Sequence, residues 1–434
     1  MSDYEHVQKQ DKEVFTALEG EEHRESEGLE LIPSENYVSK AVREANGSCL
    51  TNKYAEGYPG KRYYGGQTYT DQVETLAIER AKKLFNCDHA NVQPLGGAAA
   101  NIAAYFAWLE PGDAIMGMDL GHGGHLTHGH PVTYMAKLFR FTRYKMKDVE
   151  TGEIDYDEMR EVAKKERPKI ILGGFSAYPR ELDWAKISDI AKEVGAVAMA
   201  DVAHIAGLIA GGVAKNPFDY GFQIVTTTTH KTLRGPRGGM ILSKGIVSNP
   251  MKAVEKTVEN LPTLIDRSVF PGFQGGPHMN NIAAKAVAFG EALQPAFKTY
   301  AAQIIKNAKA MEVVFKKNNI RLLTGGTSNH LLLADVWSSL SLGGRDAEDV
   351  LNAVGITLNK NSIADDTRKP FDPSGIRFGT PAITTRKFGE KECAHVAELM
   401  VDAMKNKDNE KRLAEIREEI RTLCKKFPIP ESFL

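Results

Sequence analysis

Two apolar segments of the sequence end in residues that could perform chemistry. VAMADVAH contains Asp201, and IVTTTTHK ends in Lys231, 30 residues further along the chain. A lysine amine condenses with the aldehyde of pyridoxal phosphate, and a carboxylate keeps the pyridine nitrogen of that cofactor protonated so that the ring accepts electrons. The pair therefore indicates a pyridoxal-phosphate site. The alternative is that Lys231 only extends from a surface loop and that Asp201 only caps a helix.

A glycine-rich loop could hold the phosphate of such a cofactor. NVQPLGGAAAN (91–101) leads from a strand-like segment into an alanine-rich helix. Backbone amides at a helix N-terminus, together with the helix dipole, bind phosphate. We expect Gly97 and Ala98 to lie at that phosphate. The loop matches neither G-x-G-x-x-G nor the Walker A pattern, and a tight turn is the alternative.

Four histidines, His122, His125, His128 and His130, lie close together in GHGGHLTHGH (121–130). Such a cluster could bind a metal ion, but no H-E-x-x-H pattern and no nearby carboxylate accompanies it. We therefore predict no metal site and expect the rings to stack and to form hydrogen bonds in a glycine-lined pocket.

Two further segments combine glycine with aromatic residues. TNKYAEGYPGKRYYGG (51–66) holds four tyrosines around Glu56, and FPGFQGGPH (270–278) is another glycine loop. A tyrosine-rich surface is typical of a protein interface, and a glycine loop is typical of a turn. These are the alternatives to a direct role in a binding site.

The order of the segments indicates an α/β fold. Apolar runs at 114–119, 169–176, 194–203, 224–229 and 239–243 alternate with helical patterns such as 71–85 and 155–166. Strands that are apolar throughout predict a mostly parallel sheet with helices on both faces and ligands at the carboxyl ends of the strands. We expect an N-terminal arm with helices (1–50), a large cofactor-binding domain (51–290) and a small α+β domain (291–434). The small domain should contain a helix over 295–317, a strand over 330–336 and two helices between 388 and 426.

The composition argues against several classes of function. The chain has 434 residues, 55 Lys+Arg against 56 Asp+Glu, and 4 Cys without a C-x-x-C pair. A net charge of −1 provides no basic surface for nucleic acid. No apolar stretch reaches the roughly 18 residues of a membrane span, and the charged N-terminus lacks a signal-peptide pattern. We expect a soluble cytoplasmic protein that binds neither nucleic acid nor membrane.

Taken together, these segments resemble the serine hydroxymethyltransferase family of pyridoxal-phosphate enzymes, which has fold type I. The resemblance extends over essentially the whole chain in the order and spacing of the family. Its most specific segments are KYAEGYPGKRYYGG (53–66) and TTTTHKTLRGPRGG (226–239). The others are LIPSENYVS (31–39), GHGGHLTHG (121–129), GGFSAYP (173–179), DVAHIAGL (201–208), LNKNS (358–362) and SGIRFGTPA (374–382).

The resemblance implies a role for each matching residue. Lys231 would form the internal aldimine with pyridoxal 5′-phosphate, Asp201 would pair with the pyridine nitrogen, and His125 would stack on the ring. The catalytic set would be Lys231, Glu56, Asp201 and His230, with Glu56 as the acid/base group. The cofactor contacts in full would be Ser34, Tyr54, Tyr64, Gly97, Ala98, His125, Ser176, Asp201, His204, His230, Lys231, Arg237, Gly275 and Gly276.

The resemblance also implies partners and substrates. The family forms obligate dimers, so a homodimer or a dimer of dimers is expected, and the residues that would reach the neighbouring subunit's cofactor are Tyr54, Glu56, Tyr63, Tyr64, Gly275 and Gly276. The amino-acid substrate, serine or glycine, would contact Ser34, Glu56, Tyr63, Tyr64, His204 and Arg377, whose guanidinium suits a carboxylate. The pocket for tetrahydrofolate or a related pterin would comprise Leu120, Gly124, His125, Leu126, Asn361, Lys369, Pro370 and Phe371.

The sequence departs from the family in two places. Around the phosphate the family usually carries hydroxyl side chains, whereas this chain has Gly96 and Ala98. The loss of such hydrogen bonds to a charged group costs about 1.5–3 kcal/mol each. Phe273 stands where a glycine is usual, beside the inter-subunit loop, and is expected to narrow the site.

The expected reaction is reversible transfer of the serine hydroxymethyl group to tetrahydrofolate. One alternative on the same scaffold is a folate-independent aldolase that acts on β-hydroxy or α-methyl β-hydroxy amino acids. Another is a non-catalytic protein that binds RNA or a metal ion. The intact pair of Lys231 and Asp201 and the lack of a basic stripe argue against the second alternative.

Overall fold

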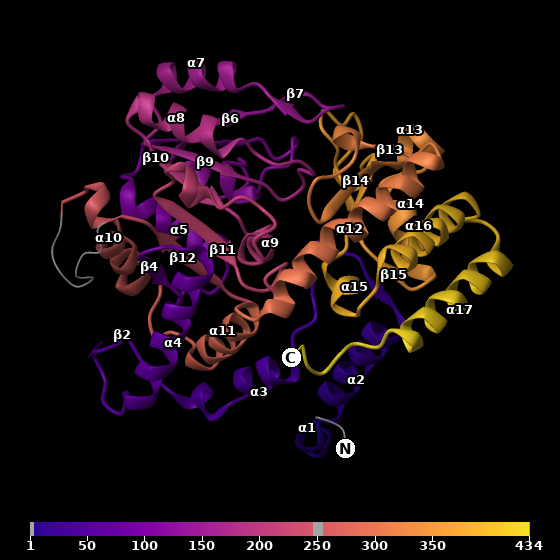
Figure 1. The fold of residues 1–434 in the computed structure, drawn as a ribbon, viewed down its shortest axis with the longest axis horizontal. Coiled ribbons are helices and arrows are strands. Elements are labelled where there is room, and N and C mark those ends of the chain that lie inside the picture. The colour runs from indigo at the N-terminus through magenta and orange to yellow at the C-terminus, as the bar shows by residue number, and fades with distance from the viewer. Residues whose placement is uncertain (1–3, 246–254, 434) are drawn as a thin grey trace.

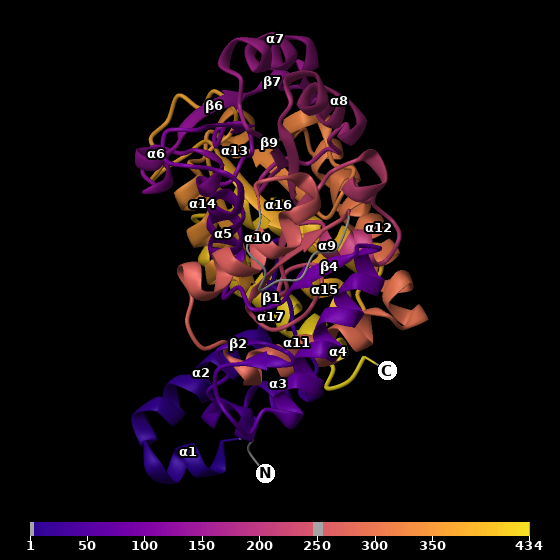
Figure 2. The same cartoon turned by 90° about the vertical axis from the view of Figure 1, so that its left-hand side faces the viewer.

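The computed structural model describes residues 4–245 and 255–433 of the chain. Figure 1 shows a large domain and a smaller domain that are joined by the long helix α12 (Pro295–Lys317). The helices of the N-terminal arm lie beneath both domains, and Figure 2 shows them projecting from the rest of the molecule.

A seven-stranded sheet forms the centre of the large domain. Its strands, in order across the sheet, are β4 (His89–Asn91), β12 (Gly239–Ser243), β11 (Ile224–Thr228), β10 (Val197–Asp201), β9 (Ile170–Gly174), β5 (Ala114–Met118) and β6 (Arg140–Tyr144). β12 is antiparallel to both neighbours, and the other neighbouring pairs are parallel. The prediction of a mostly parallel sheet is therefore confirmed.

All five apolar runs of the sequence form strands of this sheet, but β6 was not predicted. Its sequence, RFTRY, exposes Arg140 and Arg143 and buries only Tyr144. As the last strand of the sheet, β6 pairs with β5 alone, so its charged side chains reach water and leave no continuous apolar run in the sequence.

Alternate residues of the central strands face two different cores. Ile171 packs with Trp184 in one core, whereas Ile170 and Leu172 pack with Ala104 in the other. The first face is covered by α4 (Thr68–Phe85), α7 (Tyr156–Glu166), α8 (Trp184–Val194) and α11 (Met279–Ala292), and the second by α5 (Gly97–Trp108) and α10 (Leu261–Arg267). The expectation of helices on both faces is confirmed.

The small domain has its own sheet and its own core. The antiparallel strands, in order, are β13 (Arg321–Leu322), β14 (Leu331–Asp335), β17 (Gly375–Gly379) and β16 (Asn359–Asn361). The helices are α13 (Val336–Leu340), α14 (Gly344–Ala353), α15 (Pro381–Thr385), α16 (Glu390–Lys405) and α17 (Glu410–Lys426). The predicted strand and the two predicted C-terminal helices are therefore present.

Helix α12 contributes to both cores. Ile304 lies in a core of the large domain, and Ala308 and Phe315 lie in the core of the small domain. The helix has the predicted bounds, 295–317. The domain boundary at 290/291 stays a prediction, because this one helix serves both domains.

The N-terminal arm contacts both domains. It contains α1 (Glu5–Gln10), α2 (Lys12–Glu27), β1 (Leu29–Glu30) and α3 (Lys40–Asn46). β1 pairs in parallel with β15 (Ile356–Thr357) of the small domain, with Leu29 opposite Ile356. Val42 of α3 packs against Ala284 and Ala288 of α11 in the large domain. The arm therefore links the two domains.

The remaining elements are short. They are the pair β2 (Gly57–Tyr58) and β3 (Lys61–Arg62), the pair β7 (Met146–Asp148) and β8 (Glu153–Ile154), and the helices α6 (Met135–Leu138) and α9 (Ala206–Ala210). Helical turns span Cys49–Asn52, Leu126–His128, Pro217–Tyr220, Val258–Asn260, Ser268–Phe273 and Leu323–Gly325. None of the helices in the described ranges is long and apolar enough to cross a membrane.

Arg386, which follows α15, fastens the arm to the small domain. Its side chain is 1% exposed, and its guanidinium donates hydrogen bonds to the carbonyls of Gly28 (2.7 Å) and Phe427 (2.7 Å). It also donates to Glu25 (3.2 Å) and Cys424 (3.0 Å). These carbonyls lie at the ends of α2 and α17, where backbone acceptors lack intrahelical donors. The buried Arg386 side chain therefore supplies hydrogen-bond donors to carbonyls at the C-terminal ends of both α2 and α17.

Replacing Arg386 with methionine should destabilise the protein. The substitution leaves several buried carbonyls without donors, so we expect the free energy of unfolding to fall by about 3–5 kcal/mol. Urea denaturation measures this change, and hydrogen exchange should increase in the last turns of α2 and α17. The control is Lys391→Met, an exposed lysine on α16, with an expected effect of about 0.5 kcal/mol or less. Similar losses in the two variants would contradict the role given to Arg386.

Candidate active site

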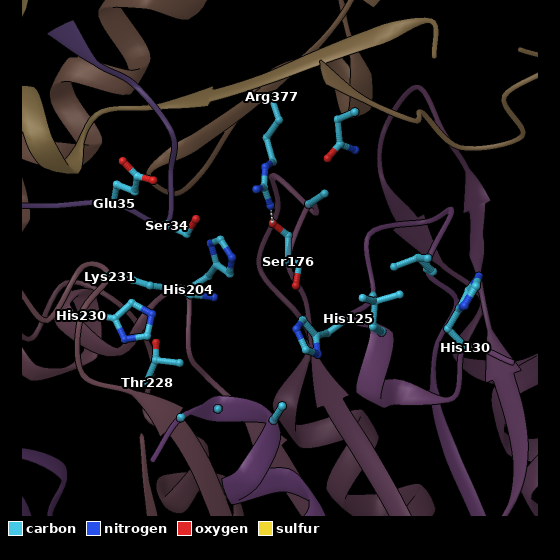
Figure 3. A pocket seen from close by; sticks show the side chains of 18 of the residues that line it. Ser34, Glu35, His125, His130, Ser176, His204, Thr228, His230, Lys231 and Arg377 are labelled. Carbon is cyan, nitrogen blue, oxygen red and sulfur yellow. Dashed lines mark hydrogen bonds between the residues drawn. The ribbon is translucent and has the colours of Figure 1, made fainter. Parts of the chain in front are cut away.

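The main cavity lies at the carboxyl ends of the parallel strands, where ligands bind in open α/β sheets. Its volume is about 890 Å³. Figure 3 shows side chains from the arm, from the loops that follow the central strands and from the small domain around it: Ser34, Glu35, His125, His130, Ser176, His204, Thr228, His230, Lys231 and Arg377. Both domains and the arm therefore build one site.

Lys231 lies on the loop that follows β11 and lines the cavity. Burial disfavours its charged form and lowers the pKa of the amine to about 8, although the negative charge of Asp201 acts in the opposite direction. The backbone carbonyl of Lys231 accepts hydrogen bonds from Asn36 Nδ2 (3.0 Å) and from the backbone N–H of Arg234 (3.0 Å). The backbone of Lys231 is therefore held in place, and near neutral pH a larger fraction of its amine is uncharged than in an ordinary lysine.

Arg234 stabilises the turn that follows Lys231. Its backbone has a φ of +59°, in the left-handed region. Its guanidinium carbon lies 3.7 Å from the ring centroid of Phe433 and 4.3 Å from that of Tyr300. Cations stack favourably on aromatic faces. The C-terminal segment therefore packs behind the loop that carries Lys231.

Asp201 ends β10 and is buried; it does not line the cavity itself, but its carboxylate lies within 4.8 Å of a ring nitrogen of His125, which does. Its Oδ2 accepts hydrogen bonds from Asn101 Nδ2 (2.8 Å) and His128 Nε2 (3.1 Å), and its Oδ1 accepts one from the backbone N–H of Ala203 (3.1 Å). Burial alone would raise the pKa of this carboxyl group, but the hydrogen bonds from His128 and Asn101 act in the opposite direction, and the pKa lies well below its ordinary value. Asp201 is therefore ionised at neutral pH.

Both ring nitrogens of His128 form hydrogen bonds. Nδ1 accepts the backbone N–H of His125 (3.2 Å), so the ring proton is assigned to Nε2, which donates to Asp201. Possible ligand atoms of His125, His128 and Asp201 lie within 4.8 Å of one another. The sequence argument that no carboxylate accompanies the histidines is therefore wrong, because the fold supplies one from a distant strand end. The absence of a metal site stays a prediction.

His125 and His204 lie on the cavity wall as neutral rings. Burial lowers the pKa of His125 to about 4, and its Nδ1 lies 2.7 Å from Thr127 Oγ1. Burial also holds the pKa of His204 well below its ordinary value. His204 Nδ1 lies 3.2 Å from His330 Nε2, and the two rings are stacked with centroids 5.4 Å apart. His330 thus fixes the orientation of the His204 ring.

Arg377 of β17 brings a cation into the cavity from the small domain. It donates hydrogen bonds to the Ser176 carbonyl (2.7 Å; Figure 3) and to Asn359 Oδ1 (3.1 Å). Burial lowers the pKa of Arg377 to about 10, which leaves it charged at neutral pH. A positioned guanidinium of this kind binds carboxylates.

The expected phosphate loop forms another part of the cavity wall, which Gly96, Gly97 and Ala98 line. Gly96 precedes α5 with an extended φ of −175° and no capping side chain. A Cβ on Gly97 would lie 2.8 Å from Thr228 Cγ2, whereas a Cβ on Gly96 would meet nothing within 4 Å. The close packing of α5 on β11 therefore requires glycine at 97 but not at 96.

His230 and Arg237 also line the cavity. His230 Nδ1 accepts the backbone N–H of Gly238 (3.3 Å), and burial together with the charge of Arg237 lowers the pKa of His230 to about 3. The ring is therefore neutral, and Arg237, which is exposed, carries the charge of this pair.

Most of the residues expected for the pterin pocket line the cavity. They are Leu120, Gly124, His125, Leu126, Asn361 and Pro370. Leu120 and Leu126 are partly exposed and form an apolar part of the wall. Lys369 and Phe371 do not line the cavity, and the Phe371 side chain is 83% exposed.

The other expected residues form a second cluster that does not line the cavity of the same chain. Tyr54 donates a hydrogen bond to Glu56 Oε1 (2.9 Å), and its ring packs edge-on against that of Tyr64. Gly275 and Gly276 lie against this pair: a Cβ there would stand 3.4 Å from Glu56 Oε1 and 3.2 Å from the Tyr54 ring, respectively. Tyr63 lies apart from this pair, with its ring centroid 5.7 Å from that of Phe270.

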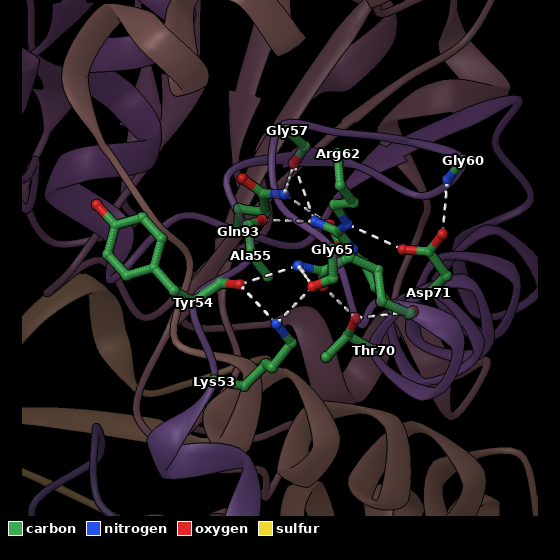
Figure 4. A network of polar contacts seen from close by, with 12 residues as sticks. Lys53, Tyr54, Ala55, Gly57, Gly60, Arg62, Gly65, Thr70, Asp71 and Gln93 are labelled. Carbon is green, nitrogen blue, oxygen red and sulfur yellow. Dashed lines mark hydrogen bonds and ion pairs between the residues drawn. The ribbon is translucent and has the colours of Figure 1, made fainter.

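A buried arginine holds the loop that carries this cluster (Figure 4). Arg62 forms ion pairs with Asp71 (2.9 Å) and Glu74 (2.5 Å) and donates to the Ala55 carbonyl (2.9 Å). Gln93, which precedes the phosphate loop, donates to Glu74 Oε1 (2.8 Å) and to the Gly57 carbonyl (2.9 Å; the latter in Figure 4). The network therefore fixes the Glu56 loop relative to the phosphate loop of the same chain.

Phe273 does not line the cavity of its own chain. Its ring packs on Phe106 of α5, with centroids 4.9 Å apart, and 47% of the residue is exposed. Its expected effect on the site of a neighbouring subunit stays a prediction.

Three positioning residues were missed by the sequence analysis: Asn36, Asn101 and His330. Asn101 ends NVQPLGGAAAN, His330 begins the strand over 330–336, and Asn36 lies within LIPSENYVS. Asn101 and His330 are buried, Asn36 is half-buried, and all three are hydrogen-bonded. A buried polar group needs a partner, so a polar residue bordering an apolar or glycine-rich segment was the available signal. The hydrogen-bond partners of these three residues could not be predicted from the sequence.

One comparison with known protein families bears on this site. The family model described as serine hydroxymethyltransferase matches residues 7–400 of the chain. The match includes the arm, the large domain and the strands of the small domain, and therefore all of the cavity described above.

The low pKa of Lys231 predicts unusual reactivity of its amine. Reductive methylation with formaldehyde, followed by mass spectrometry, should give a half-maximal rate at Lys231 near pH 8, since only the uncharged amine attacks an aldehyde. In Asp201→Asn the midpoint should move to lower pH, because the negative charge that favours the ammonium form is gone. A midpoint near the ordinary lysine value of roughly 10.4, or one that rises in the variant, would contradict this account.

Proposed function

The chain belongs to the serine hydroxymethyltransferase family, and we propose that it transfers the hydroxymethyl group of serine reversibly to tetrahydrofolate, giving glycine and 5,10-methylenetetrahydrofolate. Family membership makes it a pyridoxal-phosphate-dependent enzyme of fold type I, in agreement with its mostly parallel seven-stranded sheet. The observation that carries the proposal is one cavity lined by Lys231 and Arg377, with the ionised Asp201 buried within 4.8 Å of the His125 ring in its wall.

The residues of the cavity fit pyridoxal phosphate. The Lys231 amine donates no hydrogen bond to any residue in the described ranges, so it is free to bind an aldehyde. The close approach of Thr228 to Gly97 keeps the start of α5 bare, and its backbone amides would hold the phosphate. Asp201 would hold the pyridine nitrogen. When bound, the ring supplies a place for the electron pair released by bond cleavage at the amino-acid α-carbon.

Side chains of the cavity and its surroundings move protons and orient the substrate. A pKa near 8 lets Lys231 take up or release a proton at its amine near neutral pH. The ionised Asp201, oriented by His128 and Asn101, would keep a proton on the pyridine nitrogen. Arg377 binds the carboxylate of the amino acid and thereby orients the α-carbon. The neutral ring of His204 adds no positive charge beside that guanidinium.

We assign the acid/base step at the serine hydroxyl to Glu56. Its carboxylate does not line the cavity of its own chain and lies in the exposed cluster with Tyr54 and Tyr64. Tyr54, Tyr63 and Tyr64 are 54%, 64% and 50% exposed, which is typical of side chains that a partner covers. The proposal therefore includes a homodimer in which Glu56 of each subunit serves the cavity of the other.

The main alternative is a folate-independent aldolase with the same cofactor. The cavity favours the transferase, because Leu120 and Leu126 provide an apolar wall beyond the polar groups that an amino acid would use. A flat aromatic co-substrate such as a pterin needs such a wall, whereas serine does not.

Serine cleavage should depend on tetrahydrofolate. We expect glycine formation to be about tenfold faster or more with the carrier than without it, because the carrier accepts the one-carbon unit. Leu126→Asp should raise the KM for tetrahydrofolate while leaving the KM for serine nearly unchanged. Equal rates with and without tetrahydrofolate would favour the aldolase and contradict the transferase.

Hybrid dimers test the shared site. Lys231→Ala and Glu56→Gln should each be nearly inactive alone. When equal amounts are co-expressed or are dissociated and reassociated, activity should return to about a quarter of the wild-type value, since half of the dimers are mixed and each mixed dimer contains one intact site. The control is a mixture of Lys231→Ala with Asp201→Asn, whose lesions lie in one cavity and should not complement. Failure of the first mixture, with mixed dimers shown to form, would place Glu56 outside the partner's site.

A further inference from the structure

A buried lysine lies directly behind the glycine-lined part of the cavity wall. Lys285 of α11 is 1% exposed. Its Nζ donates hydrogen bonds to the carbonyls of Val92 (2.7 Å), Pro94 (3.1 Å) and Gly239 (3.0 Å). Val92 and Pro94 belong to the segment that leads to Gly96, and Gly239 begins β12. The ammonium therefore holds the two backbone segments that meet at the phosphate loop.

Gly238, which forms part of the cavity wall, lies directly against the end of the Lys285 side chain. A Cβ on Gly238 would lie 2.5 Å from Lys285 Cε and 2.9 Å from Lys285 Nζ. Gly238 itself lines the cavity, together with Gly96 and Gly97. Because glycine carries no side chain, the charge acts on the cavity across a single thickness of backbone.

Within the described residues, the charge of Lys285 has no ion-pair partner of opposite sign. Its three acceptors are neutral carbonyls, and no carboxylate in residues 4–245 and 255–433 forms an ion pair with it. Glu74, whose charge acts on Lys285, is itself bound to Arg62 and Gln93. Burial lowers the pKa of Lys285 to about 7. A buried cation without a counter-ion is unfavourable, so an anion beyond Gly238 would stabilise it.

We propose that Lys285 supplies the positive charge that retains the phosphate of pyridoxal phosphate, acting through Gly238 as a positioning residue that does not touch the cofactor. The inference rests on the proposed function, which places the phosphate at the start of α5. The charge of Lys285 would compensate for the hydroxyl donors that are missing from the phosphate loop, where this chain has Gly96 and Ala98. Arg237 also lines the cavity but is exposed, so solvent and salt screen its charge more than that of Lys285.

The test compares two aldehydes that differ only in the phosphate. Apoprotein is titrated with pyridoxal phosphate and with pyridoxal, and the visible absorption band of the bound aldehyde gives each Kd. In Lys285→Met and Lys285→Gln, the affinity for pyridoxal phosphate should fall about tenfold or more, while the affinity for pyridoxal changes by about twofold or less. A purely structural role would lower both affinities by the same factor.

Lys285→Gln, one control variant and the wild type make the result decisive. Lys285→Gln retains a donor for the three carbonyls, so it decides the question if Lys285→Met does not fold, as judged by thermal unfolding. Lys298→Met, an exposed lysine on α12, changes the net charge by the same amount and should leave both affinities unchanged. Equal losses for the two aldehydes, or no loss, would overturn the role of Lys285. A wild-type apoprotein that binds neither aldehyde would overturn the proposed function instead.

Discussion

A largely buried carboxylate that stays charged is the constraint on which the rest of the site depends. A buried charge is tolerated only where donors surround it, and the donors to Asp201 come from α5 through Asn101, from the histidine loop through His128 and from its own turn through Ala203. These groups are held in turn. Thr226 of β11 donates to Asn101 Oδ1 (2.6 Å), and the backbone N–H of His125 donates to His128. The hydrogen bonds to and around the Asp201 carboxylate therefore fix β10, β11, α5 and the histidine loop relative to each other.

Lys231 is subject to the opposite requirement, because its amine must be able to lose its charge. The cavity meets this requirement by burial, which lowers the pKa of the amine by more than the nearby charge of Asp201 raises it. The backbone of Lys231 is meanwhile held by Asn36 of the arm and by the turn at Arg234. Chemistry at Lys231 thus depends on residues that lie nearly 200 positions away in the sequence as well as on its own loop.

The sequence predicted the parts of the molecule whose signal is local. The apolar runs of β5, β9, β10, β11 and β12 stand out because both faces of the sheet are buried, and Asp201 and Lys231 stand out because they are polar residues at the ends of such runs. The exposed edge strand β6 has no such run. Asn101, His330 and Lys285 were missed because each acts through a partner brought close only by the fold. For the same reason the carboxylate beside the histidines was overlooked.

The pairing of β1 with β15 also sets the order in which the chain can fold during synthesis. Leu29 lies opposite Ile356, so this strand has no partner until another 327 residues have been added. At about 5–20 residues per second, the wait is roughly 15–65 s on the ribosome. During that time Leu29 and Leu31, which end in the core of the small domain, lack their burial sites. The emerging N-terminus is therefore the part of the nascent chain most in need of a chaperone.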